Sequence, residues 1–292
     1  MRFMAENGTV VTEFILMVLP LWAELQMGLF FVFLVLYLIT IGGNLGMIVL
    51  IQSDCRLQTS MYFFLSHLSF LDICYSSLIV PQLLETLGTD KMVITFERCT
   101  TQFFFFTLCA STECFLSAVM GYDLYVTVCN PLLYATAMPP QARLRLVARA
   151  YGGSNHMDFF FCDLPPLLKL ACSETFLVIT TSVSVIFISY LFIIQAILKI
   201  CSAGGKAKPF STCASHITAV ALFFGTLIFI YLKGNMGKSL GEDNIASAFY
   251  TVVIPMLNPM ISSLRNKEVK EALKRVLNRM KKTFLNIQSY II

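Results

Sequence analysis

Six long apolar stretches constrain this chain more than any other feature of its sequence. They lie at residues 27–51, 62–83, 101–122, 177–198, 216–232 and 245–264. A helix needs roughly 20 apolar residues to cross the hydrocarbon core of a bilayer, and each stretch approaches or exceeds that length. Only 13% of the residues are charged, against roughly 25% in an ordinary soluble domain. The sequence therefore predicts an all-α membrane protein with about six clear spans.

The positions of the basic residues predict which loops face the cytoplasm, because cytoplasmic loops are enriched in Lys and Arg. One basic loop contains Arg143, Arg145 and Arg149, a second covers 199–208, and a basic tail follows at 265–282. The net charge of +4 resides in these short segments, so it does not indicate a nucleic-acid partner. If all three segments face the same side, the chain between 149 and 199 must cross the membrane twice. It contains only one adequate span.

The stretch that would have to supply the extra crossing is a poor membrane segment. Residues 159–171 are about half a span long and contain Pro165 and Pro166, which break helices. A central Asp or Lys costs roughly 2.5 to 3.5 kcal/mol on translocon scales, and insertion would bury Asp158, Asp163 and Lys169. Either the helix at 177–198 crosses outward and the later loops invert, or 144–171 enters as an imperfect fourth segment. We expect a mixed population, with 144–171 outside the hydrocarbon in most molecules.

The segment 120–134 carries the most specific motif of the chain, reading M-G-Y-D-L-Y-V-T-V-C-N-P-L-L-Y. It resembles the string M-A-Y-D-R-Y-V-A-I-C at the end of the third helix in olfactory receptors, a branch of the rhodopsin-like G-protein-coupled receptors. Strings in four other spans are similar to the same family: Gly43-Asn44, Leu71-Asp72-Ile73-Cys74, Phe210 to His216, and Pro255 to Pro259.

The resemblance implies a rhodopsin-like transmembrane helix bundle with the fourth helix missing or incomplete. A single receptor-like domain would then cover 1–292, with an extracellular N-terminus at 1–26, the bundle at 27–264 and an amphipathic cytoplasmic tail at 265–292. In the tail, apolar residues recur at helical spacing among basic ones, which is typical of a helix on an anionic membrane surface.

The function implied by the resemblance is that of an odorant receptor at the plasma membrane. It would bind a small, volatile, apolar ligand and signal through a heterotrimeric G protein of the olfactory type. Neither an enzyme activity nor a cofactor is expected, because His216 has no acid placed to complete a catalytic triad with Ser211 or Ser215. One alternative is a decayed, silent receptor retained in the endoplasmic reticulum. A six-span channel or transporter would require inverted repeats, which the sequence does not display.

The resemblance also assigns site residues. The ligand-facing positions are Phe106, Thr107, Ala110 and Ser111 on the third helix and Phe224, Leu227 and Tyr231 on the sixth; plain helix packing is the alternative for such a stripe. The ion-binding and activation network comprises Asn44, Asp72, Asp123, Tyr125, Asn258 and Pro259. Two positions depart from the family pattern, since Leu124 replaces the arginine of the Asp-Arg pair and Ser262 replaces the tyrosine of N-P-x-x-Y.

The polar segments contain the remaining candidates. By the resemblance, Cys99 at the start of the third helix pairs with Cys162, while Cys172 is left without its usual partner. Asn7-Gly8-Thr9 is a glycosylation acceptor if the N-terminus is lumenal. His156, Cys162 and Cys172 are too few for a structural zinc site, which takes four close ligands, so no metal is expected.

Overall fold

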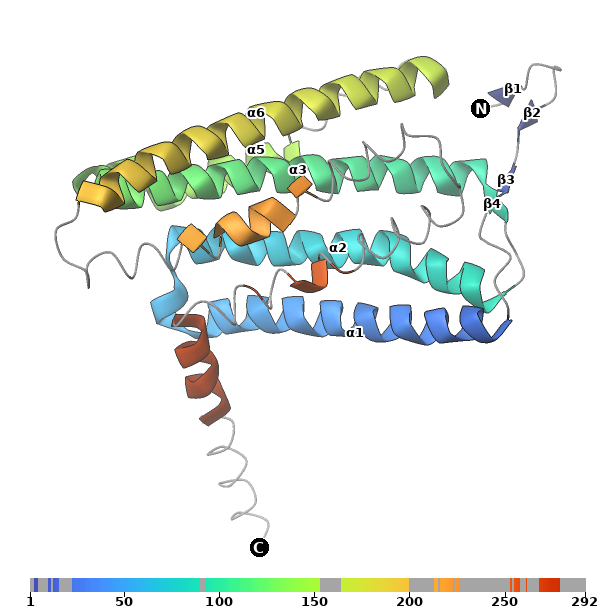
Figure 1. Cartoon of the computed structure of the whole chain (residues 1–292), viewed down its shortest axis with the longest axis horizontal. Coiled ribbons are helices and arrows are strands. Elements are labelled where there is room, and N and C mark those ends of the chain that lie inside the picture. The colour runs from blue at the N-terminus through green and yellow to red at the C-terminus, as the bar shows by residue number, and fades with distance from the viewer. Residues whose placement is uncertain are drawn as a thin grey trace, which may run out of the picture.

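The computed structural model describes residues 3–4, 10–11, 13–15, 23–89, 93–152, 164–199, 213–214, 216–222, 224–225, 253, 255–257, 261 and 268–278. Four long helices run lengthwise through the molecule (Figure 1): α1 (Ala23–Ser53), α2 (Ser60–Gly88), α3 (Phe96–Cys129) and α6 (Leu164–Lys199). The shorter elements are β1 (Phe3–Met4), β2 (Val10–Val11), β3 (Glu13–Ile15), η1 (Cys55–Leu57), β4 (Val93–Thr95), η2 (Pro131–Leu133), α4 (Tyr134–Ala137) and α5 (Pro140–Gly152). Two antiparallel pairs form among the strands, β1 with β2 and β3 with β4.

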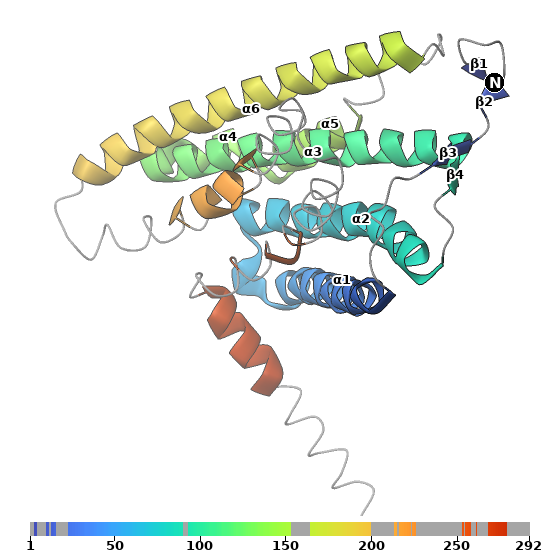
Figure 2. The same cartoon turned by 45° about the vertical axis from the view of Figure 1, so that its right-hand side comes forward.

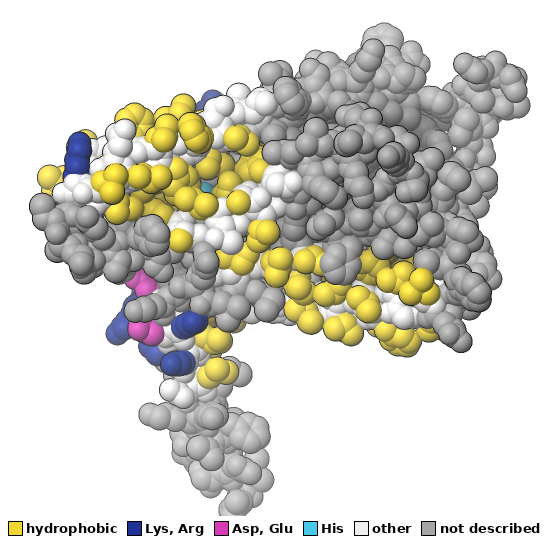
Figure 3. Space-filling model, in the orientation of Figure 1, with side chains coloured by type: hydrophobic (Ala, Val, Ile, Leu, Met, Phe, Trp, Pro, Cys, Tyr) yellow, Lys and Arg dark blue, Asp and Glu magenta, His cyan; other side chains and the backbone are white. Residues whose placement is uncertain are grey.

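Helices with the length and hydropathy of membrane spans occur four times in the described residues. They are Leu25–Ser53, Ser60–Gly88, Glu97–Cys129 and Thr180–Lys199, and they confirm four of the predicted spans. Hydrophobic side chains gather on the outer surface of α1 and of the described part of α6 (Figure 3). Of the predicted span at 216–232, the described residues up to 225 are helical. The span predicted at 245–264 falls largely outside the described residues.

Helix α3 lies at the centre of the bundle, packed between α2 and α6 (Figures 1 and 2). Its first turn is capped by Thr95, whose hydroxyl accepts from the backbone N–H of Arg98. It ends at Cys129, because the residue before Pro131 is pushed out of the helical conformation. Phe64 and Leu71 of α2 pack with Leu116 of α3 in a buried core that continues onto α5.

Helix α6 corrects one prediction. It begins at Leu164 and continues for 36 residues to Lys199, so Pro165 and Pro166 do not break it. Both prolines occupy its first turn, where backbone N–H groups have no helical acceptor and the fixed φ of proline suits a helix.

The fourth helix is incomplete rather than absent. Helix α5 has 13 residues, which extend for about 20 Å at 1.5 Å per residue, short of the roughly 30 Å hydrocarbon core. Val147 and Ala150 are buried, and the Thr112 hydroxyl on α3 donates to the Ala150 carbonyl at 3.2 Å. Residues 144–152 therefore pack along the middle of α3. The expectation that 144–171 lies outside the hydrocarbon in most molecules stays a prediction.

The ends of several helices meet at one end of the bundle, the left end in Figure 1. Here the Cys129 thiol lies 3.6 Å from the Phe192 carbonyl, joining the last turn of α3 to α6. The Tyr62 hydroxyl at the start of α2 donates to Glu268 in the tail at 2.9 Å. Helices α3 and α6 run in the same direction, and both end here (Figure 1). The mixed membrane topology expected from the sequence stays a prediction.

Topology tags test this arrangement in cells. We expect glycosylation acceptors inserted after Lys208 and after Lys282 to remain unmodified in molecules that are glycosylated at Asn7. The reason is that α3 and α6 point the same way, which places the segments after them on the predicted cytoplasmic side. An acceptor inserted after Asp90 serves as the positive control. Glycosylation of either of these two tags would contradict the prediction that the segments after α3 and α6 lie on the same side of the membrane.

The tail forms a helix at 268–278 that docks on the ends of α1 and α2. Val269 and Ala272 are fully buried beside Met47, Leu57 and Tyr62. The tail was predicted to rest its apolar side on the membrane. In the structure that side is divided, because Leu273 and Leu277 are exposed while Val269 faces protein. Met280 lies outside the described residues.

An ion pair fixes the tail helix to the loop between α1 and α2. Arg275 donates from Nε and Nη2 to Oδ2 of Asp54, each at 2.8 Å. The Arg275 hydrogen bond, followed by the backbone N–H of Arg56, lowers the pKa of Asp54 below its ordinary value. A lowered pKa means that the pair is intact at neutral pH and is lost only as the pH falls through that value.

Breaking this pair is expected to loosen the tail. In Asp54→Asn, hydrogen exchange at the backbone amides of 268–278 should become faster, since Arg275 loses its charged acceptor. Glu271→Gln is the matched control, because Glu271 also pairs with Arg275 but at 3.8 Å and with an exposed side chain. Equal acceleration in both variants would mean that Asp54 has no particular role in docking.

Candidate functional site

Asp123 is the buried acid at the predicted cytoplasmic end of α3. It is 1% exposed, and its Oδ1 accepts a hydrogen bond from the Tyr134 hydroxyl at 3.1 Å. The turn at Asn130 and Pro131 carries the chain back so that Tyr134, in α4, lies beside α3. Burial raises the pKa of Tyr134, which keeps its phenol protonated as a donor. Asp123 thus has a neutral partner in place of the arginine expected from the family pattern.

Leu124 is buried in an apolar contact between three segments. Its neighbours in this cluster include Ile186, Tyr190 and Ile193 of α6 and Cys213 and Phe224 of the sixth segment. Ile193 is fully buried, and Leu124 is 4% exposed. The side chain that replaces the family arginine therefore joins α3, α6 and the sixth segment by packing.

A polar pair lies within the same contact. The Tyr190 hydroxyl donates to the Cys213 carbonyl at 3.3 Å and lies 2.7 Å from Nδ1 of His216, with the two rings stacked at 21°. Gly121 of α3 faces Ile186 of α6, and a Cβ at this position would meet the Ile186 backbone at 3.7 Å, an ordinary van der Waals distance. Tyr125, predicted in the activation network, packs its ring against Phe192 of α6, with centroids 5.7 Å apart.

The predicted ligand positions divide between two environments. Thr107 and Ala110 are buried inside the bundle, and Ser111 is half-buried. Phe106 instead stacks on Tyr75 of α2 with ring centroids 4.9 Å apart, which is a packing contact. Phe224 joins the cluster at Cys114, one helical turn below Ser111. Leu227 and Tyr231 lie outside the described residues.

The predicted ion network is described in part. Asn44 is fully buried, and its Nδ2 donates to the carbonyls of Thr40 and Pro255, both at 3.0 Å. The second of these bonds ties α1 to the seventh segment. Asp72 is 2% exposed in α2. Asn258 and Pro259 lie outside the described residues, as do Asn7 and Cys162, so the glycosylation and the Cys99–Cys162 pairing stay predictions.

Two features of the site were missed from the sequence. The pairing of Tyr134 with Asp123 depends on a chain reversal that no periodicity indicates. The Tyr190–His216 contact had a signal, since both are polar residues inside apolar runs, and buried polar groups seek hydrogen-bond partners. His216 was considered only as a catalytic base, a role that its buried contact with a tyrosine does not support.

Comparison with known proteins decides the family. A family model described as "Olfactory receptor" matches residues 33–148 and 139–280, which together cover most of the chain. The chain belongs to the olfactory receptor family. It is 56% identical to human olfactory receptor 9I1, over 95% of this chain and 98% of that one. Identity is 52% to human olfactory receptor 9Q2, over 95% and 98%, and 47% to mouse olfactory receptor 8U9, over 93% and 96%.

The comparisons also bear on the short fourth helix of this olfactory receptor family member. The match to olfactory receptor 9I1 extends over 308 aligned positions, more than the 292 residues of the chain, so it crosses gaps in this sequence. The two pieces of the family match meet at 139–148, at the start of α5. The overlap of the two pieces at 139–148 agrees with a short fourth helix in this chain. The chain is a multi-pass membrane protein of a family of receptors, not of enzymes.

Proposed function

We propose that this chain binds a small apolar odorant between its helices and signals through an olfactory-type heterotrimeric G protein at the plasma membrane. The observation that carries the proposal is identity of up to 56% to olfactory receptors along nearly the whole chain. The inward position of Thr107 and Ala110 supports it, because a closed apolar pocket with few polar groups suits such a ligand.

The signal would pass through the contact between α3, α6 and the sixth segment. An odorant near Thr107 and Ser111 is close to Phe224, which packs in the same cluster as Leu124 and Tyr190. A ligand that binds one arrangement of these helices better than another shifts the population toward it. The predicted cytoplasmic end of α3, with Asp123 and Tyr134, is where a G protein would detect that shift.

Cyclic-nucleotide accumulation against a panel of odorants, combined with surface staining of intact cells, tests the proposal. A dose-dependent response that disappears in Ala110→Trp, which fills the inward face of α3, would support odorant binding at this position. Surface-expressed protein that responds to no odorant in a broad panel would count against it.

A second candidate is a receptor that binds odorant but remains silent. The apolar packing of Leu124 favours it, because the family arginine that would contact the G protein is replaced by a side chain that stabilises the closed contact. Direct odorant binding to purified protein without any cyclic-nucleotide response would distinguish this candidate from the first.

A further inference from the structure

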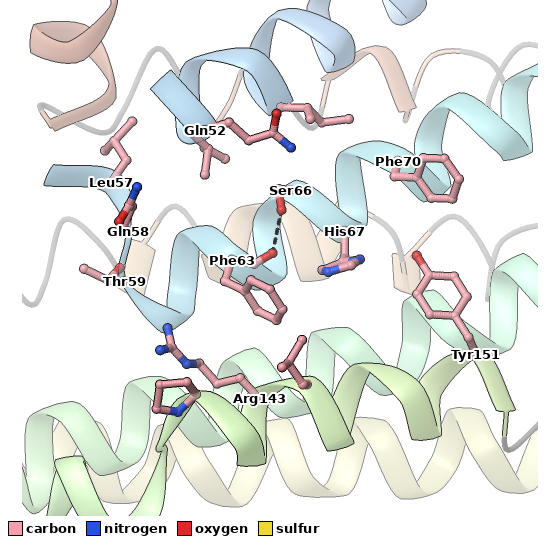
Figure 4. A pocket seen from close by; sticks show the side chains of 14 residues that line it. Gln52, Leu57, Gln58, Thr59, Phe63, Ser66, His67, Phe70, Arg143 and Tyr151 are labelled. Atoms are coloured by element: carbon pink, nitrogen blue, oxygen red, sulfur yellow. Dashed lines mark hydrogen bonds between the residues drawn. The ribbon is translucent and has the colours of Figure 1, made fainter. Parts of the chain in front are cut away.

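A groove of about 820 Å³ lies between α1, α2 and α5, on the side of the bundle that includes the end of α1 and the start of α2. Figure 4 shows α2 crossing the middle of the view, with α1 on one side and α5 on the other. The apolar part of its wall comes from Ile48, Ile51, Leu57, Phe63, Phe70 and Leu144. Phe70 and Leu144 are at least half exposed, so in a bilayer this groove opens toward lipid.

Arg143 brings a half-buried positive group into this apolar groove. Its side chain points from α5 toward α2 (Figure 4), with the guanidinium carbon 5.9 Å from the centre of the Phe63 ring. Its Nε is buried and has no hydrogen-bond partner in the described part of the chain. Asp123, which attracts Arg143 through its charge, already accepts a hydrogen bond from Tyr134. A charge-bearing donor without an acceptor is costly to bury, so the groove lacks an anionic acceptor.

Tyr151 supplies a second donor farther along the same groove. Its hydroxyl is buried and has no partner among the described residues. Its ring contacts the edge of His67, with centroids 6.1 Å apart, and His67 in turn contacts Phe63 at 4.9 Å. The groove therefore holds a cationic donor and a neutral donor, separated by an apolar and aromatic wall.

We propose that this groove binds an anionic phospholipid from the bilayer. Its phosphate accepts from Nε of Arg143, an acyl chain lies along Phe63 and Phe70, and the Tyr151 hydroxyl donates to an ester carbonyl. An uncharged sterol would bring no negative charge to Arg143. Free phosphate would leave the apolar wall uncovered. A membrane lipid satisfies both requirements and is supplied by the solvent in which the chain resides.

Photo-crosslinking in nanodiscs tests the site with the full chain. Phosphatidylcholine discs would contain a minor fraction of phosphatidylglycerol with a photoactivatable acyl chain, or phosphatidylcholine with the same chain. We expect the anionic probe to label peptides containing 63–70 and 143–151 about fivefold more than the zwitterionic probe, given the typical gain from one basic residue at an anionic membrane surface. Arg143→Gln should remove this preference.

Arg145→Gln is the matched control, because Arg145 is an exposed arginine on the same helix that does not line the groove. It should keep the preference for the anionic probe. Tyr151→Phe should weaken labelling by both probes, since both lipids carry ester carbonyls. Native protein labelled equally by the two probes would overturn the proposal without any variant, which also covers the case in which Arg143→Gln does not fold.

Three further outcomes would overturn the proposal. Equal losses in Arg143→Gln and Arg145→Gln would mean that general surface charge attracts the probe. Displacement of the probe by cholesterol at equal mole fraction would assign the groove to a sterol. Displacement by millimolar inorganic phosphate would reduce the site to a simple anion site. Retention of the probe in both competition experiments is the expected result.

Discussion

Completing the fourth helix is expected to raise the surface level of this receptor several-fold. Helix α5 ends at Gly152 after 13 residues, whereas a span needs roughly 20. Backbone groups inside hydrocarbon must find partners within the protein, which a truncated span does not guarantee. Quality control acts on such defects, and 1 to 2 kcal/mol of stability changes cellular abundance several-fold, so about this gain is expected from a repaired helix.

The test is an insertion of about 15 apolar residues after Tyr151, long enough to complete a span. Surface staining of an N-terminal tag, divided by total protein, gives the measure. An insertion of the same length made of Gly and Ser serves as the control, since it lengthens the connection without adding a helix. Equal surface levels for the two insertions would show that the short helix does not limit export.

Leu124→Arg in the repaired receptor is expected to raise the odorant-evoked cyclic-nucleotide response about tenfold, a coupling energy within the usual range for linked sites. Leu124 now packs with Ile186 and Ile193 and stabilises the closed contact of α3 with α6. An arginine there has Asp123 beside it in sequence and the Tyr190 hydroxyl nearby as an acceptor. A charge inserted among apolar neighbours weakens their contact unless it is paired, which favours opening.

Leu124→Met provides the comparison, because it nearly conserves side-chain volume and adds no charge. Its response should equal that of the repaired receptor with Leu124. Surface levels need to be matched across the three proteins, so that a change in export is not read as a change in signalling. A Met variant that signals as strongly as the Arg variant would show that loosened packing, rather than the charge, controls coupling.

The long helices could be predicted from the sequence because an isolated apolar segment in lipid has few stable backbone conformations other than a helix. An apolar run of spanning length has to satisfy its backbone within itself, and this locates α1, α2 and α3, although α3 extends five residues before and seven residues beyond its predicted bounds. The end of α3 was predictable for an equally local reason, the proline at 131. Helix ends were harder to predict where the same residue type can either break a helix or begin one. Pro165 and Pro166 were interpreted as breakers, although the same chemistry suits a helix start.

From the sequence, only the site residues that belong to family motifs could be predicted. The resemblance located Asp123 and Asn44, and both are buried. It did not indicate that Tyr134 would take over the hydrogen bond to Asp123, because that contact depends on a chain reversal through η2 and α4. The orphan donors of Arg143 and Tyr151 depend on where a shortened helix comes to lie along α2. No local pattern contains that information.

The docking of the tail helix has a consequence for the order of events during synthesis. Tyr62 and Leu57 leave the ribosome early, but Val269 and Ala272, which cover them, are among the last residues made. At 5 to 20 residues per second, roughly 10 to 40 s separate the two events. Throughout that interval the first helical hairpin is inserted but uncapped. A stop codon shortly before residue 269 would therefore leave the end of α1 and the start of α2 uncovered, although these were the first helices to be synthesised.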